Sequence, residues 1–145
     1  MRWNQINNQA DIEFLLREYF RFHDSCIIAV DYISGAKVND EGSMCGVSSG
    51  CALIIRFDSQ MPSFHHQPEK KTLGLKFIGL RRLNLIGYQD NCFPIMSSCF
   101  LAFYEDFIVW VEDDCFNPEN CSGTGLLEAP MSTFAVADRL AWRFV

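Results

Sequence analysis

The sequence predicts an α+β protein, mainly antiparallel β, with one N-terminal amphipathic helix packed on a sheet, sandwich or partly open barrel of about seven or eight strands. Only one segment has a helical period, and most of the chain after it alternates apolar and polar residues as strands do. No second helix is available for the crossovers that parallel strands require, so antiparallel pairing is expected. With 145 residues, of which 49% are hydrophobic, the chain is expected to form a single domain, 1–145.

The helix is predicted over residues 8–21. Apolar side chains recur at the spacing that places them on one face of a helix, namely Ile12, Leu15, Leu16, Tyr19 and Phe20. Asn8 is a suitable N-cap, and Asp11 and Glu13 lie in the first turn, where the helix dipole favours acidic side chains. We therefore expect this helix to lay its apolar face on the sheet.

The strands are predicted from alternation and from turn residues between apolar runs. The first is expected over residues 25–33, an apolar, β-branched run closed by the turn residues Ser34-Gly35, and Lys37-Val38 are expected to continue into its hairpin partner. The later strands are expected at residues 51–57, 72–77, 83–85, 99–104, 107–111 and 140–144. The longest segment without a period is 113–132, which is either a functional connection or a surface loop.

Charge is distributed very unevenly along the chain. No lysine or arginine occurs between Leu83 and Asp138, whereas half of the 18 acidic residues do: Asp90, Glu105, Asp106, Glu112, Asp113, Asp114, Glu119, Glu128 and Asp138. The formal net charge of -6 therefore combines -9 from this stretch with +3 from the remainder. This acidic stretch disfavours nucleic acid and anionic membranes as partners, and it favours a basic protein.

Seven cysteines, an odd number, and the absence of a C-x-x-C pair argue against a disulfide framework or a zinc module. The N-terminus lacks the apolar segment of a signal peptide, so a cytoplasmic protein is expected. Cys26, Cys51 and Cys99 lie in apolar runs and are expected to be buried. Cys115 and Cys121 lie in a polar segment, where a reactive or metal-binding thiol is more plausible.

His23 and Asp24 are the first candidates for chemistry, because an imidazole beside a carboxylate suits acid–base catalysis, with Cys26 as a candidate nucleophile. Neighbours in an extended segment point in opposite directions, so the two side chains need not touch. The junction of a helix and a strand also needs polar side chains for its unpaired backbone groups. The structural interpretation is favoured over the catalytic one.

Two further groups of residues resemble metal ligands. His65 and His66 are adjacent, which suits a single tetrahedral ion poorly. Glu112, Asp113 and Asp114 offer oxygen ligands for calcium, but the calcium-loop template requires glycine where this chain has Pro118. We therefore expect no metal site and no cofactor.

Two short segments carry a resemblance. Phe22-His23-Asp24-Ser25 precedes the first long strand, and Leu75-Lys76-Phe77-Ile78-Gly79-Leu80 forms a later one. Together they resemble a pattern in small uncharacterised bacterial single-domain proteins, some of which are grouped as immunity proteins of polymorphic toxin systems. The resemblance implies a non-enzymatic bacterial protein and assigns no catalytic residue.

The leading functional hypothesis is a non-enzymatic module that presents an acidic surface to a basic protein, for example a toxin that an immunity protein neutralises. The residues expected to form that surface are Trp110, Glu112, Asp113, Asp114, Phe116, Glu119 and Glu128. One alternative is an enzyme that uses His23 and Asp24, which requires a concave site at the end of the helix with His23 partly exposed. Another is a carrier of a small apolar ligand held between aromatic-rich strands.

Overall fold

The structure, a computed structural model, describes residues 2–46, 50–61, 69–87, 95–113, 116 and 132–145 of the chain. Its elements in order are β1 (Asn4–Ile6), α1 (Gln9–Glu18), a short 3₁₀ turn η1 (Phe20–Phe22), β2 (Ser25–Ile33), β3 (Ala36–Val38), β4 (Met44–Gly46), β5 (Ala52–Met61), β6 (Glu69–Asn84), β7 (Phe100–Tyr104), β8 (Phe107–Val111) and β9 (Phe134–Phe144).

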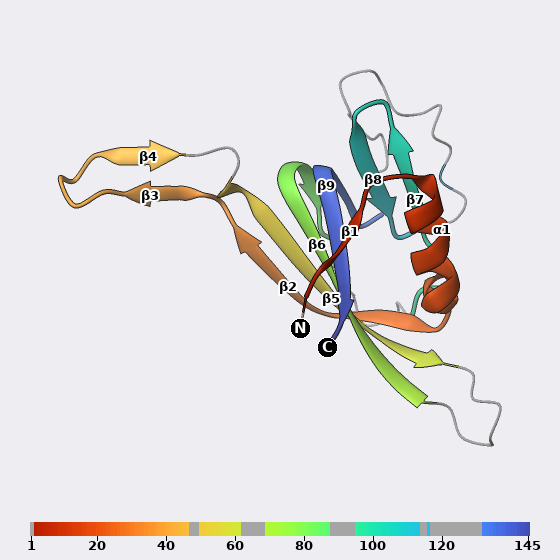
Figure 1. The fold of residues 1–145 in the computed structure, drawn as a ribbon. Coiled ribbons are helices and arrows are strands. Elements are labelled where there is room, and N and C mark those ends of the chain that lie inside the picture. Colours follow the sequence, from red (N-terminus) through yellow and green to blue (C-terminus); the bar gives the residue numbers. More distant parts are fainter. Residues whose placement is uncertain (1, 47–49, 62–68, 88–94, 114–115, 117–131) are drawn as a thin grey trace.

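Seven of the nine described strands form one antiparallel sheet in the order β2-β5-β6-β9-β8-β7, with β1 paired to the C-terminal half of β9, and β3 and β4 form a separate two-stranded sheet. Helix α1 lies over one face of this strongly curved sheet (Figure 1). The predicted α+β class with mainly antiparallel strands is confirmed, and of the arrangements considered the sheet is an open one. A single bridge between Ser25 and Met96 links β2 to the segment that precedes β7.

Helix α1 forms as its apolar period requires. Asn8 is the N-cap, and its side-chain oxygen accepts a hydrogen bond from the Asp11 amide at 3.0 Å. Ile12, Leu15 and Leu16 are buried against the sheet. The helix ends at Glu18, three residues before the predicted end, because the chain turns sharply there to enter β2.

Several strand boundaries differ from the prediction. The segments expected as two strands at 72–77 and 83–85 belong to one long strand, β6, whose pairing with β9 shifts between Leu80 and Arg82. β9 begins at Phe134, earlier than predicted, because its first half pairs with β8 as well as with β6. β1 was not predicted, since three residues are too few to show alternation. The prediction that Lys37-Val38 form a hairpin partner of β2 was wrong: β2 pairs with β5, whereas β3 pairs with β4 in a hairpin that extends away from the sheet (Figure 1).

The core lies between α1 and the face of the sheet that it covers. Alternate residues of β5, β6 and β9 point into this core, and cross-strand register brings Leu53 opposite Phe77 and Phe57 opposite Leu73. Trp110 of β8 is fully buried at its centre, in edge contact with the Phe57 ring at 5.5 Å. A second, smaller cluster occupies the opposite face of β8 and β9: Phe107, Val109, Val111, Phe134 and Val136.

Candidate functional site at the helix–strand junction

The turn between α1 and β2 has an unusual backbone. Phe20, Arg21, Phe22 and Asp24 have positive φ angles of 50°, 53°, 63° and 54°. For residues with a side chain this left-handed conformation costs roughly 1–2 kcal/mol each. Such backbone strain persists only where surrounding contacts impose it, and it clusters at functional sites.

Contacts on both sides hold this turn in place. The Phe22 ring is fully buried and packs edge-on against Tyr19 and Phe57, with ring centroids 5.0 and 5.1 Å away. The Asp24 amide donates to the Met96 carbonyl at 3.0 Å, and the Met96 amide donates to the Ser25 carbonyl at 2.7 Å. The segment 95–98 is thereby fastened beside the junction, although it is about 70 residues away in sequence.

A pocket of about 520 Å³ lies on the helix side of the turn and is called the helix pocket below. Its residues are Glu13, Leu16, Arg17, Phe20, Arg21, His23, Ser97 and Ser98, and its walls are mainly apolar. Arg21 pairs with Glu13 at 3.4 Å. Arg17 lies over the Phe14 ring and forms no ion pair with any residue that the structure describes. The formal charge of the lining, with His23 neutral, is therefore +1.

His23 and Asp24 touch, which the sequence argument had left open. His23 Nδ1 lies 3.0 Å from Asp24 Oδ2, and each side chain is about half exposed, at 52% and 53%. The partly exposed histidine that the catalytic alternative required is present beside a pocket, but Cys26 lines a different one.

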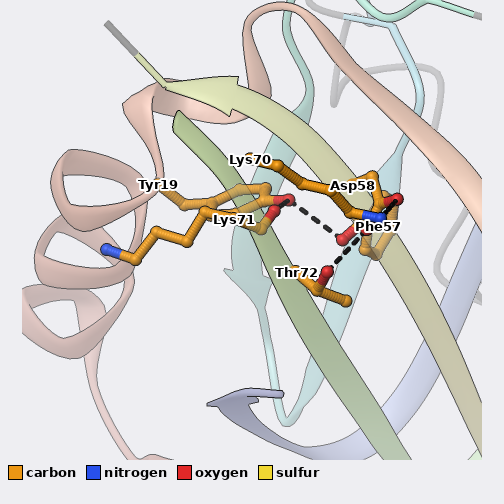
Figure 2. Close-up of polar contacts among 6 residues, drawn as sticks. All are labelled: Tyr19, Phe57, Asp58, Lys70, Lys71 and Thr72. Atoms are coloured by element: carbon orange, nitrogen blue, oxygen red, sulfur yellow. Dashed lines mark hydrogen bonds and ion pairs between the residues drawn. The ribbon is translucent and has the colours of Figure 1, made fainter. Parts of the chain in front are cut away.

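That second pocket, called the strand pocket below, has a volume of about 290 Å³ and is more polar in its residues. It is lined by Asp24, Ser25, Cys26, Asp58, Ser59, Gln60, Lys70 and Ile95. Lys70 Nζ and Thr72 Oγ1 each donate a hydrogen bond of 2.6 Å to the Asp58 carboxylate (Figure 2). Two carboxylates and one ammonium give this lining a formal charge of -1.

The Tyr19 hydroxyl closes the space between α1 and the ends of β5 and β6. It lies 3.1 Å from each of the Phe57 and Lys71 carbonyls and shares its proton between them (Figure 2). Burial raises the pKa of Tyr19 well above its ordinary value, although the nearby Ser25 and Ser59 hydroxyls oppose the shift. Ser25 Oγ is close enough to influence this pKa but is buried without a hydrogen bond of acceptable geometry among the described residues.

Replacing Asp58 by asparagine is expected to lower the free energy of unfolding at pH 7 by about 1 kcal/mol, since it weakens two hydrogen bonds to a charged group. Desolvation raises the pKa of Asp58, but the contacts with Lys70 and Thr72 outweigh it and hold the pKa below its usual 3.8. The carboxylate therefore stabilises the fold above that value, and this contribution disappears as pH falls through the lower pKa of the folded state.

Urea unfolding of wild type and Asp58→Asn between pH 2 and 7 measures this effect. The two stabilities should converge toward the acid end. A difference that stays constant over the whole range would show that the Asp58 charge is not responsible.

The described carboxylates of the acidic stretch do not gather at one place. Glu105 and Asp106 form the turn between β7 and β8, whereas Glu112 and Asp113 follow the other end of β8, about 20 Å away at the usual rise per residue. Asp138 and Asp106 also both contact Arg81, at 2.6 and 3.7 Å. One end of this hairpin is thus partly neutralised by a cation from outside the stretch.

The predicted partner-binding residues are placed as follows. Trp110 is fully buried in the core, so the prediction that it anchors a partner at the surface was wrong. Phe116 is half-buried and packs edge-on against Phe100 with ring centroids 5.1 Å apart, near Glu112 and Asp113 in sequence. Three further candidates lie outside the described residues: Asp114, Glu119 and Glu128. An acidic surface for a protein partner stays a prediction.

The cysteine and metal expectations are tested only in part. Cys99 is buried as predicted, but the prediction was wrong for Cys26 and Cys51, which are half-exposed: Cys26 lies near the start of the edge strand β2, and Cys51 directly precedes β5. Among the residues described, no cluster of three or more His, Cys, Asp or Glu side chains has the arrangement of a metal site. The candidates Cys115, Cys121, His65 and His66 lie outside the described residues.

Sequence reasoning identified His23, Asp24 and Cys26 but missed the residues that face them. Asp58 and Lys70 come from β5 and the start of β6, and Ser97 and Ser98 from the segment before β7. Their own neighbourhoods carry no signal that could have found them. Polar residues in a strand that alternates apolar and polar positions usually face solvent, and from sequence alone Asp58 is interpreted as such a residue.

None of the helices in the described part of the chain has the length and apolar character needed to cross a membrane. Comparison of the chain with protein-family models, with curated proteins and with solved structures gave no match.

Proposed function

We propose that this chain is a non-enzymatic binding protein that takes a small amphipathic anion into the helix pocket. The observation that carries the proposal is the composition of that pocket: an apolar wall from Leu16 and Phe20 beside Arg17, a guanidinium without a carboxylate partner among the described residues. Its volume of about 520 Å³ lies within the range of small-molecule sites.

The strained turn supports the same assignment. Four residues with side chains adopt a left-handed conformation within five positions, and three of them carry or adjoin pocket side chains: Phe20, Arg21 and Asp24. A simple loop could connect α1 to β2 without this conformation. The strain is consistent with a turn selected for where it places Phe20, Arg21 and His23.

The two earlier alternatives are less well supported. A carrier of apolar ligands between the strands needs an unfilled interior, whereas the described core is occupied by the rings of Phe22, Phe57, Phe77 and Trp110, which meet edge-on or tilted. An enzyme needs a reacting group within reach of His23, and Cys26 lines the other pocket. The contact between Asp24 and the His23 imidazole does not by itself indicate catalysis, because it would also orient a histidine that only binds a ligand.

The test compares octanoate with octan-1-ol, which differ only in the anionic group. Binding is followed by chemical-shift changes in ¹H–¹⁵N spectra of the whole chain at pH 7. We expect octanoate to shift signals of the helix pocket and to bind about fivefold more weakly to Arg17→Gln, because one charged contact of moderate strength is lost. Octan-1-ol should bind both proteins equally.

Arg82→Gln is the matched control, since Arg82 is an exposed arginine on β6 that does not line the pocket. It changes the net charge by the same amount and should leave octanoate binding unchanged. The proposal is abandoned if millimolar octanoate causes no shifts in the pocket, or if Arg17→Gln and Arg82→Gln behave alike.

A further inference from the structure

The helix pocket and the strand pocket lie on the two sides of one contact. His23 lines the helix pocket, Asp24 lines the strand pocket, and their side chains are 3.0 Å apart. The segment 95–98 borders both, with Ile95 on the strand pocket and Ser97 and Ser98 on the helix pocket. The two pockets therefore adjoin at the His23–Asp24 pair.

The two linings carry opposite charge. Arg17, Arg21 and Glu13 give the helix pocket a formal +1, whereas Asp24, Asp58 and Lys70 give the strand pocket a formal -1. The Lys70 side chain is 71% exposed, and its ammonium group lies 2.6 Å from Asp58 Oδ2, so a carboxylate of this lining already binds an ammonium group (Figure 2). Asp24, at 53% exposure, retains oxygen surface beyond its contact with His23.

A buried polar atom in the strand pocket lacks a partner. Ser25 is fully buried, lines this pocket, and its Oγ has no hydrogen bond among the described residues. An unpaired buried hydroxyl is unfavourable, and such groups in native structures call for an explanation. A hydroxyl oxygen accepts a hydrogen bond from an ammonium group as readily as from water.

We infer that the ligand of the junction is a zwitterion with an apolar middle, bound with its anionic end in the helix pocket and its ammonium end in the strand pocket. This inference rests on the proposed function, because it assigns the anionic end to the same Arg17 site. The apolar middle passes Phe20 and Ile95, two large side chains exposed at 45% and 55% that flank the His23–Asp24 pair on its two sides. Short apolar peptides and ω-amino fatty acids belong to this chemical class.

The probe is 8-aminooctanoate, which adds one ammonium group to octanoate and leaves the rest unchanged. We expect it to bind wild type at least about fivefold more tightly than octanoate at pH 7, and to shift signals of Asp24, Ser25 and Ser59 that octanoate leaves unmoved. In Asp24→Asn this gain, measured against the affinity of the same variant for octanoate, should fall to less than twofold. Asparagine tolerates the left-handed backbone of this position, so the variant is expected to fold.

Asp31→Asn is the matched control. Asp31 is a carboxylate of β2 that pairs with Arg56 at 2.7 Å and lines neither pocket. Asp31→Asn removes the same charge as Asp24→Asn and should leave the higher affinity for 8-aminooctanoate unchanged. The comparison therefore separates a local ammonium site from attraction of the ammonium group to the net negative charge of the protein.

The outcomes distinguish the two proposals. Equal affinity for octanoate and 8-aminooctanoate overturns the zwitterion inference and leaves the anion pocket standing, as does a gain that Asp24→Asn and Asp31→Asn reduce equally. No binding of either probe overturns both.

Discussion

Replacing Trp110 by alanine is expected to lower the free energy of unfolding by about 4 kcal/mol, the largest effect we predict for a single change. The indole is fully buried at the centre of the core and packs against Phe57 and Phe77, with ring centroids 5.5 and 6.4 Å away. Its removal leaves a cavity that rigid strands on either side cannot close. Urea unfolding followed by circular dichroism measures the loss.

Trp110→Phe is expected to cost much less, about 1 kcal/mol. The indole Nε1 is buried without a hydrogen-bond partner among the described residues, so phenylalanine removes an unsatisfied donor along with some packing. Phe14→Ala, a change at a ring that is 45% exposed, serves as the surface control. A loss below about 1 kcal/mol for Trp110→Ala would instead place the indole at the surface.

The second large effect is expected from Gly79→Ala, which should destabilise the fold by about 2–3 kcal/mol. Gly79 has a φ of 68°, where an added side chain costs roughly 1 kcal/mol or more. A Cβ atom there would also collide with the Asp138 carboxylate, lying 2.9 Å from Asp138 Cγ. Asp138 would have to move, which disturbs its 2.6 Å contact with Arg81.

A double-mutant cycle separates these two contributions. In an Asp138→Ala background the carboxylate is gone and only the Cβ of residue 138, 3.1 Å from the added Cβ, remains close. Gly79→Ala should then cost little more than the backbone term of about 1 kcal/mol. Equal costs in both backgrounds would show that the backbone conformation alone accounts for the glycine. Thermal unfolding of the four proteins gives the comparison.

The prediction for Trp110 also shows where alternation misleads. Phe107–Val111 is apolar at all five positions, and all five residues are buried, because α1 covers one face of β8 and a second cluster covers the other. An unbroken apolar run is typical of a strand buried on both faces. Trp110 was nevertheless interpreted as a surface anchor, because it lies two residues before the acidic group that begins at Glu112. The apolar run itself indicated burial and was the better guide.

Local patterns were reliable where the causes are local. The Asn8 cap, the apolar stripe of α1 and the exact span of β2 follow from interactions within a few residues. The end of the helix was not predicted, because the left-handed turn from Phe20 to Phe22 is imposed by packing of Phe22 against Phe57 of β5. No residue preference favours that turn, and bulky side chains disfavour it.

The candidate site, too, could be predicted from the sequence only in part. His23, Asp24 and Cys26 could be identified from sequence because they are neighbours of unusual chemistry at a junction of elements. Which of them cooperate was decided only by the tertiary structure, which places His23 in one pocket and Asp24 and Cys26 in another.

By itself, the sequence determined the kind of elements this chain forms, its α+β class and its uneven charge, because periodicity and composition are properties of short segments. Only the tertiary structure decided that Asp58, Lys70 and residues 95–98 surround the junction, and that Arg81 lies between Asp106 and Asp138. Antiparallel pairing and the Ser25–Met96 bridge bring these residues together across dozens of positions. Strand order and register therefore determine which charges meet, and neither can be deduced from alternation along a single strand.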